Sequence, residues 1–540
     1  MRIFKSFIVG ILCFSLIFTW GCSRQNNATN NDDQKILKVA QTEDPKTGDV
    51  QRTTEDYAIP LNIYDRLVEA ETTSPGVSEL VTGLAEKWDV SDDGRIYTFY
   101  LRKGVKFHNG EELKADDVLF TFDRMLNPNT KALNTDFLDM IDGAKDRMEG
   151  KSDNVKGLKV IDDYKIEITL EKSFAPFLAN LATPAGSIYN RKATEEAKDQ
   201  FGLEPKLTVG TGPFKLKEWV VNDHVTLEAF DGYFRGRADL NGVLYKIIPD
   251  GETQRMLFET GELDVFDCDN ARSQIPYFEK SDKWKNQVVK GPRVGIYYYC
   301  INESIKPFDD VRVRKAIQMG INKQLILDKM YYGKGEVANA IMPPGLAGHN
   351  PSAKEIQYDL EKGKELLKEA GYPDGFDMTI AQITDKPNTL KVNEIVQAML
   401  KEIGINVEIK QMDSASFYGT RREGKLPMYL SDWSADFNDP DNFIYTFFAP
   451  RNSKARSFNY NNEDVAQKLE TARCMINQEE RYKLYQEMEE QIVINDAAWV
   501  PLFTLEHLFV VQPKVKNFKV AWNGWSNMPY YSIKIEEQEK

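Results

Sequence analysis

One strand–helix–strand segment constrains the fold of this chain more than any other feature. Residues 376–383 are typical of a strand, and so are residues 405–411. The helix between them carries one apolar stripe and stops at Gly404; the stripe consists of Val392, Ile395, Val396, Met399, Leu400 and Ile403. Two strands joined by such a helix lie parallel in one sheet. The segment therefore predicts an α/β domain in the second half of the chain.

Further elements follow from alternation and from turn residues. Residues 36–40 and 97–102 alternate between apolar and polar side chains, as strands do. Asp116 and Asp117 open a helix with acids at its positive end. After Gly210 the pattern changes to short strands around one helix; we expect the strands at 225–229, 243–248 and 262–267 and the helix at 252–260. The change indicates a separate region of the fold.

The first residues indicate export. Arg2 and Lys5 accompany an apolar run that ends at Trp20, which is the length of a signal-peptide core and short for a membrane span. We therefore expect residues 1–21 to be a signal peptide. Residues 22–35 are polar and rich in Asn, so we expect a disordered tether.

Cys22 is the candidate lipidation site. A small residue before a Cys at the end of a signal segment resembles the lipobox of bacterial lipoproteins, although Thr19 and Trp20 depart from that pattern. Cleavage before Cys22 and diacylglycerol attachment to its sulfur would anchor the protein at the cell surface or in the periplasm. The alternative is an ordinary signal peptide that ends near a chance cysteine.

Chain length and net charge limit which class of protein this can be. A chain of 540 residues is too long for one compact core, so two or three domains are expected. The net charge is -14 and no basic stripe is present, which argues against a nucleic-acid partner. Beyond Cys22 only Cys268, Cys300 and Cys474 remain, and we expect three small buried side chains rather than a disulfide framework.

The sequence contains no recognisable motif for catalysis. It has no phosphate loop, no nucleophile elbow and no paired zinc histidines; His108, His224, His349 and His507 are scattered. The densest acidic segment, residues 432–442, lacks the glycine and the closing glutamate of a calcium loop, so an acidic turn is the simpler interpretation. We expect a protein that is not an enzyme, with no catalytic residue, no metal site and no cofactor.

Six segments occur in a characteristic order along nearly the whole chain. They are residues 83–94, 101–110, 210–214, 307–314, 369–373 and 433–443. In this order they resemble the extracellular solute-binding proteins of family 5, the oligopeptide- and dipeptide-binding lipoproteins of ABC transporters.

The resemblance implies an α/β, two-lobed periplasmic-binding-protein-like fold of type II, in the large cluster C form, with an extra inserted domain. It implies a first lobe made of residues 36–68, 206–298 and 500–540. The inserted domain would be residues 69–205, and the second lobe residues 299–499.

The resemblance also implies ligand-binding residues. In the family the acid that stands here as Asp436 pairs with the α-ammonium of a bound peptide, with Trp433 and Ala435 beside it. Arg421 matches an arginine that approaches the peptide. A carboxylate facing the ammonium offsets the cost of removing that charge from water and leaves the choice of ligand side chain free.

Three further positions complete the candidate site. Lys391 lies near the place where dipeptide binders carry an arginine for the ligand carboxylate. Asp267 and Asp269 stand where the family often has an aromatic residue, and they are the next candidates for the ligand amine. Ser414 and Leu430 replace a tryptophan and an arginine of the oligopeptide pattern, which leaves the ligand length open.

The expected function is that of the substrate-binding component of an ABC importer. It would capture di- to oligopeptides in a cleft between the lobes, as a monomer, and deliver them to the permease subunits in the membrane. The alternative is a binding protein for a metal chelate, such as a nickel complex or haem, or another small solute on the same scaffold. A secreted hydrolase is a more distant alternative.

Overall fold

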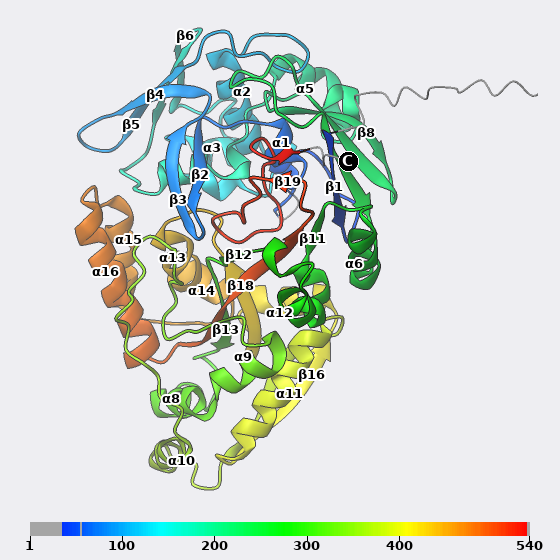
Figure 1. Ribbon diagram of the computed structural model, residues 1–540. Helices are drawn as coiled ribbons and strands as arrows, with labels where there is room; N and C mark the ends of the chain where they lie inside the picture. The colour runs from blue at the N-terminus through cyan, green and yellow to red at the C-terminus, as the bar shows by residue number, and fades with distance from the viewer. Residues whose placement is uncertain (1–34, 55–56, 537–540) are drawn as a thin grey trace, which may run out of the picture.

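The computed structural model describes residues 35–54 and 57–536 (Figure 1). The predicted signal peptide, Cys22 and nearly all of the predicted tether lie outside the described residues. Within the described ranges, no helix combines the length and the apolar character that crossing a membrane requires.

The first lobe is built on a four-stranded sheet that joins distant parts of the sequence. Strand β1 (Ile36–Gln41) runs parallel to β10 (Gly242–Ile247), with Leu37 opposite Val243. Strands β9 (His224–Ala229) and β8 (Phe214–Val220) continue the sheet in antiparallel pairs. The predicted strands at 36–40, 225–229 and 243–248 are confirmed. Because β1 joins the sheet of β8, β9 and β10, which follow it only after Pro213, the chain between β1 and β8 contains a separate region.

That intervening region has its own sheet and core. Strands β4 (Ala85–Val90), β5 (Ile96–Leu101), β7 (Lys165–Thr169) and β6 (Leu158–Asp162) form an antiparallel sheet in that order, at the top of Figure 1. The predicted helix after Asp116 is α2 (Ala115–Leu126), which contacts β6 and β7. Buried side chains from Leu67 to Val209 form one continuous cluster.

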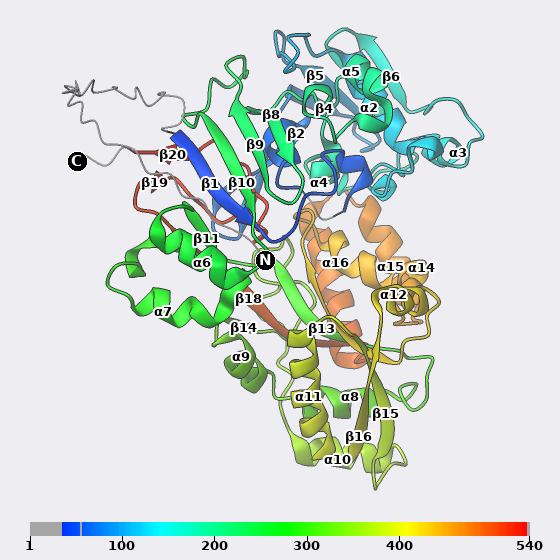
Figure 2. The ribbon, with the colours of Figure 1, turned by 90° about the vertical axis from the view of Figure 1, so that its right-hand side faces the viewer.

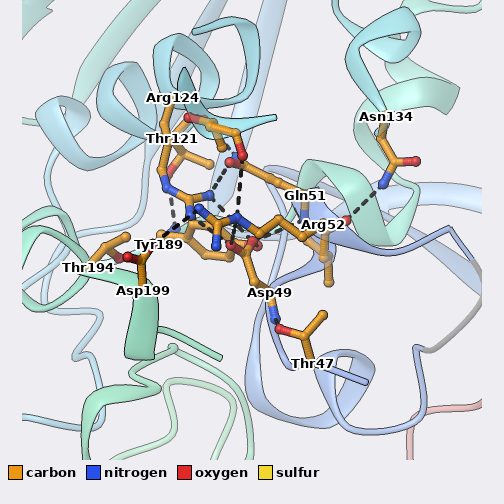
Figure 3. Close-up of polar contacts among 12 residues, drawn as sticks. Thr47, Asp49, Gln51, Arg52, Thr121, Arg124, Asn134, Tyr189, Thr194 and Asp199 are labelled. Atoms are coloured by element: carbon orange, nitrogen blue, oxygen red, sulfur yellow. Dashed lines mark hydrogen bonds and ion pairs between the residues drawn. The ribbon is translucent and has the colours of Figure 1, made fainter. Parts of the chain in front are cut away.

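An ion pair fastens this inserted region to the first lobe (Figure 3). Nη2 of Arg124, on α2, lies 2.6 Å from Oδ2 of Asp49, which precedes the short helix η2 (Val50–Arg52). The Tyr189 hydroxyl donates to the other oxygen of the Asp49 carboxylate at 2.9 Å. A buried carboxylate that is paired and hydrogen-bonded holds two elements in one orientation, because separating them would leave the charge without a partner.

The second lobe contains the predicted parallel unit. Strand β15 (Phe376–Ile383) pairs in parallel with β16 (Ile405–Met412), and helix α11 (Pro387–Lys401) connects them. This confirms the α/β prediction. The sheet continues through β17 (Met428–Ser434) and β13 (Gly295–Ile301) to β18 (Trp499–Val511).

Alternate side chains of β13 reach opposite faces of this sheet, as the strand geometry requires. Tyr299 and Ile301 belong to the core beneath helices α8 (Val311–Gly320) and α11. Tyr298 and Cys300 belong to the core beneath helices α13 (Ile444–Phe448), α15 (Glu463–Cys474) and α16 (Gln478–Glu490). The sheet is therefore covered on both faces.

Two segments cross between the lobes side by side (Figure 2). The first half of β18 pairs with β13 in the second lobe, where Val500 lies opposite Tyr299. Its second half pairs with β12 (Val288–Pro292) and with β11 (Val265–Asp267) next to the first lobe. Arg293 and Val294 join β12 to β13, so the chain crosses at 288–301 and again along β18.

The predicted strand at 262–267 is shorter in the structure, and only Val265–Asp267 pair. Helix α6 (Gly251–Thr260) ends at Gly261, and the amide of Leu263 still bonds back to the helix. The Asp264 carboxylate accepts a hydrogen bond from the Lys38 amide and pairs with Lys514. These contacts take Glu262 to Asp264 out of the strand.

Candidate functional site

The loop after β17 carries the predicted ligand-binding segment and is fixed at its base. The amide of Ala435 donates to the carbonyl of Val294, in the crossing segment, at 2.8 Å. The side chain of Asn523, from the C-terminal part of the chain, donates to the carbonyl of Ala435 at 3.1 Å. Ala435 is fully buried by these neighbours, so it sets the backbone position of the next residue, Asp436.

One residue, Asn442, orients both Trp433 and Asp436. Its side-chain oxygen accepts from the Asp436 amide at 2.9 Å, and its Nδ2 donates to Oδ2 of Asp436 at 3.1 Å. Its carbonyl accepts from the indole nitrogen of Trp433 at 3.0 Å. The aromatic ring and the carboxylate are therefore held in a fixed relation before any ligand arrives.

The other acids of this segment are occupied by internal contacts. Asp439 forms two hydrogen bonds with Arg481, at 2.7 and 2.8 Å. Asp441 accepts from the Tyr485 hydroxyl at 2.9 Å and pairs with Arg473 at 3.2 Å. These contacts shape the loop and disfavour a calcium site, because the carboxylates already have cationic partners. Asp436 forms no ion pair among the described residues; its carboxylate accepts a hydrogen bond from Asn442, and the Arg456 charge acts on it without direct contact.

The environment of Asp436 favours the approach of a cation. Burial raises the pKa of Asp436 to about 6; the Asn442 hydrogen bond and the Arg456 charge oppose the rise, and the nearby Asp136 adds to it. A half-buried carboxylate whose charged form is disfavoured gains free energy when a cation binds beside it. Asp136 belongs to the inserted region, so charges from two parts of the molecule act on this carboxylate.

A cavity of 580 Å³ adjoins Asp436. Its walls come from the loop residues Asp436, Phe437 and Asn438, from the hairpin of β2 (Val68–Ser74) and β3 (Val77–Thr82), and from C-terminal residues between Asn517 and Ile533. The inserted region reaches the same loop through Phe137, whose ring lies 6.1 Å from that of Phe437. The cavity is of the size that small organic ligands occupy.

Arg421 and Trp433 belong to the second lobe and are not among the residues that line this cavity, and an arginine that the sequence analysis missed lies beside Trp433. Arg421 lies at the end of helix α12 (Ser414–Arg422), with its guanidinium 4.8 Å from the centre of the Tyr418 ring. Arg456 lies 4.8 Å from the Trp433 ring and 4.6 Å from the Phe447 ring. No motif marks Arg456; only the folded chain brings it to Trp433.

Lys391 lies apart from these residues. It is exposed on the first turns of α11, and no hydrogen bond or ion pair joins its side chain to the residues that the structure describes. Lys386, the N-cap residue of the same helix, acts on the sheet instead, because its charge reaches Asp432. Burial raises the pKa of Asp432 on β17, and Arg293, Lys386 and Arg272 counteract that rise.

Asp267 and Asp269 occupy a charged cluster at the crossing segments. Oδ1 of Asp267 lies 2.8 Å from Nε2 of His507 on β18, and Asp269 pairs with Arg293 and with Arg272. Asp267, Asp269 and His507 present ligand atoms within 4.8 Å of one another, a spacing that a metal could use. The two arginines already neutralise Asp269, so the residues present do not fit a metal ion well. The structure does not bring these acids together with Asp436.

The fold and this site define a ligand-binding protein, with its candidate site on a loop anchored to the segments that cross between two lobes. The chain belongs to the bacterial extracellular solute-binding proteins, family 5; the model for the middle part of that family matches residues 79–455. The prediction made from the six segments is thereby confirmed.

Relatives and solved structures agree with the assignment. The chain is 32% identical over 488 residues to the dipeptide-binding protein of Escherichia coli, which covers 86% of this chain and 87% of the relative. It is 31% identical over 490 residues to heme-binding protein A of Haemophilus influenzae, covering 88% and 87%. The periplasmic binding protein DppA of Helicobacter pylori, in complex with the peptide STSA, superposes with a TM-score of 0.77 at 30% identity, covering 93% and 98%.

Proposed function

We propose that this protein captures short peptides between its lobes and delivers them to the permease of an ABC importer. The observation that carries the proposal is the Asp436 carboxylate: it is half-buried, oriented by Asn442, in no ion pair among the described residues, and adjacent to a 580 Å³ cavity. A peptide α-ammonium supplies the missing charge and can donate hydrogen bonds to the carboxylate. The peptide complex of the related DppA supports this choice of ligand.

The mode of capture follows from the crossing segments. We infer that the two lobes rotate about residues 288–301 and β18. The first lobe would consist of residues 36–68, 206–298 and 500–540, and the second of residues 299–499. Closure would narrow the cavity that the loop at 436–438 and the C-terminal residues already line together. The protein would act as a monomeric carrier and not as an enzyme.

The anchor belongs to the same proposal. Lipid attached to Cys22 would hold the carrier beside its permease, at the cell surface or in the periplasm. Replacing Cys22 with Ser should release the protein from the membrane fraction. Equal membrane retention of the Cys22→Ser variant would contradict the anchor.

Haem is the second candidate ligand, because one relative is a heme-binding protein. Among the described residues, those that line the cavity beside Asp436 include no histidine or cysteine, so a haem bound there would depend on contacts other than ligation of its iron by those side chains. Native mass spectrometry of the purified protein, followed by denaturation and identification of the released molecule, separates the candidates. Peptides of a few residues support the proposal, and a released metal complex contradicts it.

A further inference from the structure

The inserted region touches the second lobe at the end of helix α15 (Figure 2). The amide of Ala175, in the inserted region, donates to the carbonyl of Arg473 at 2.8 Å. Earlier in the same helix, Glu470 pairs with Lys172 of the inserted region, and the atoms Oε2 and Nζ lie 2.8 Å apart. Both of these side chains are about half-exposed, so their ion pair adds little free energy. The buried contacts of Arg473 therefore matter more for this interface.

The side chain of Arg473 lies between the inserted region and the loop at 436–442. Its guanidinium lies 4.7 Å from the centre of the Phe174 ring, which is buried in the core of the inserted region. On the second-lobe side the guanidinium lies 3.7 Å from the centre of the Tyr445 ring, and Nε lies 3.2 Å from Oδ1 of Asp441. A cation gains more free energy over an aromatic face when both are removed from water. One buried arginine therefore contacts both sides of the interface.

Asp139, in the inserted region, acts on Arg473 through its charge. Oδ1 of Asp139 is buried and accepts no hydrogen bond from the residues that the structure describes. Burial raises the pKa of Asp139 to about 6; among its charged neighbours Arg473 has the largest effect, and it opposes the rise. Burial alone would lower the pKa of Arg473, but nearby groups, Asp441 first and Asp139 among them, outweigh it and the pKa is raised. Acids on both sides of the interface thus stabilise this one cation.

Arg473 is connected to Asp436 through the backbone of the loop. Asp441 and Asn442 share one turn of 3-10 helix, Pro440–Asn442, and Asp441 pairs with Arg473. Asn442 in turn accepts from the amide of Asp436 and donates to its carboxylate. Arg473 itself is not among the residues that line the cavity beside Asp436. Any effect of Arg473 on a bound peptide must therefore pass through this turn.

We propose that Arg473 is a positioning residue for peptide capture, which couples the docking of the inserted region on α15 to the orientation of Asp436. While the region is docked, Phe174 covers the guanidinium and the ion pair with Asp441 stays in a low dielectric. When the region separates, water reaches the ion pair and weakens it. Docked molecules are then the ones competent to bind, and the apparent affinity follows their fraction. This inference rests on the proposed function and adds to it a residue that does not touch the peptide.

Peptide binding by matched variants tests the inference. Ala-Ala, Ala-Ala-Ala and Ala-Ala-Ala-Ala are titrated into the native protein by calorimetry, and the tightest binder is used for all variants. Its dissociation rate is measured by stopped-flow displacement. Arg473→Gln and Arg473→Lys are compared with Arg147→Gln, because Arg147 is as buried as Arg473 but pairs with Asp123 inside the inserted region.

A second pair of variants changes the other side of the interface. Phe174→Leu removes the ring that covers Arg473, and Phe177→Leu is its control. Both rings are buried in the same core, and the Phe177 ring packs on that of Tyr97. Thermal unfolding of every variant is recorded first, so that a loss of affinity is separated from a loss of stability.

Arg473→Gln should raise the dissociation constant about 10- to 100-fold, mainly through faster dissociation. Arg473→Lys should restore part of the affinity, because the charge remains without the planar group that stacks on the rings. Phe174→Leu should weaken binding several-fold, whereas Arg147→Gln and Phe177→Leu should bind as the native protein does, even where they unfold at a lower temperature. The double variant of Arg473→Gln and Phe174→Leu should bind little more weakly than Arg473→Gln alone, since both changes remove the same contact.

Three results would overturn the inference while leaving the proposed function intact. Arg473→Gln that binds the peptide as tightly as Arg147→Gln does contradicts it. If Arg473→Gln does not fold, equal affinities of Phe174→Leu and Phe177→Leu contradict it instead. Losses from Arg473→Gln and Phe174→Leu that add in full show that the two residues do not act through one contact. Native protein that binds none of the three peptides overturns the proposed function and this inference with it, so the two failures are distinguishable.

Discussion

The Asp267 carboxylate lies 2.8 Å from Nε2 of His507 at the junction of the crossing segments. Nδ1 of the same ring lies 2.7 Å from the carbonyl oxygen of Gly524. A carbonyl and an ionised carboxylate can only accept hydrogen bonds, so both ring nitrogens donate and the ring is an imidazolium. Burial alone would raise the pKa of Asp267, but His507 and the Ser526 hydroxyl outweigh it, and the pKa is lowered.

Asp267→Asn should therefore destabilise the protein strongly. It leaves the fully buried His507 facing only Asp269, whose carboxylate is 3.8 Å away and is shared with two arginines, and breaking a buried pair in this way costs about 3–5 kcal/mol. The native pair contributes its stability above the ordinary pKa of an aspartate and loses it as pH falls through the lowered pKa. Urea unfolding should show a large difference from the native protein at pH 7, and the difference should shrink toward pH 3.

The matched control for this prediction is Asp282→Asn, since the Asp282 side chain is almost fully exposed and pairs with Lys285 at the surface. Its unfolding midpoint should stay unchanged. Equal midpoints for Asp267→Asn and Asp282→Asn would show that the Asp267–His507 contact is not a stabilising ion pair.

Peptide affinity should depend on pH through Asp436. With a pKa of about 6, the free carboxylate is mostly protonated at pH 5, and a neutral acid cannot pair with an ammonium. The apparent dissociation constant should rise about tenfold between pH 7 and pH 5. Fluorescence titration across this range measures it, and Asp436→Asn, which has no proton to gain, should show a flat profile. A native profile that is equally flat would contradict the assignment.

Ligand binding should close the molecule. The first half of β18 pairs with a strand of the second lobe, and its second half pairs with strands beside the first lobe. Rotation about this segment therefore changes the distance between the lobes and leaves the core of each lobe intact. Small-angle scattering should show a smaller radius of gyration with saturating peptide than without it. The Asp436→Asn variant at the same peptide concentration should remain in the free form. A profile that saturating peptide leaves unchanged argues against closure.

Much of the fold could be predicted because apolar stripes and alternating strands are patterns of neighbouring residues. The stripe from Val392 to Ile403 defines α11, and the alternation at 376–383 and 405–411 defines its two flanking strands. The strand at 262–267 was overextended because Asp264 takes its partners from Lys38 and Lys514, far away in the sequence. Alternation alone carries no information about such contacts.

The candidate site could be predicted only in part. The segment at 433–436 is contiguous, so one motif indicated Trp433 and Asp436 together. Arg456 comes from another stretch and reaches Trp433 only through the packing of α13 and α14 beside the sheet. Asp267 and Asp269 were candidates because they stand where the family often has an aromatic residue, yet their partners His507 and Arg293 lie on crossing segments that the sequence does not reveal.

A four-corner calorimetric cycle at Asp436 tests the central claim most directly. It compares a free and an N-acetylated form of one peptide against the native protein and Asp436→Asn. Removing either charge should weaken binding by about 2–5 kcal/mol, roughly 30- to several-thousand-fold, because the partner is left desolvated and unpaired. Since both changes remove the same interaction, the double change should cost little more than one. Losses that simply add would show that Asp436 does not hold the peptide amine.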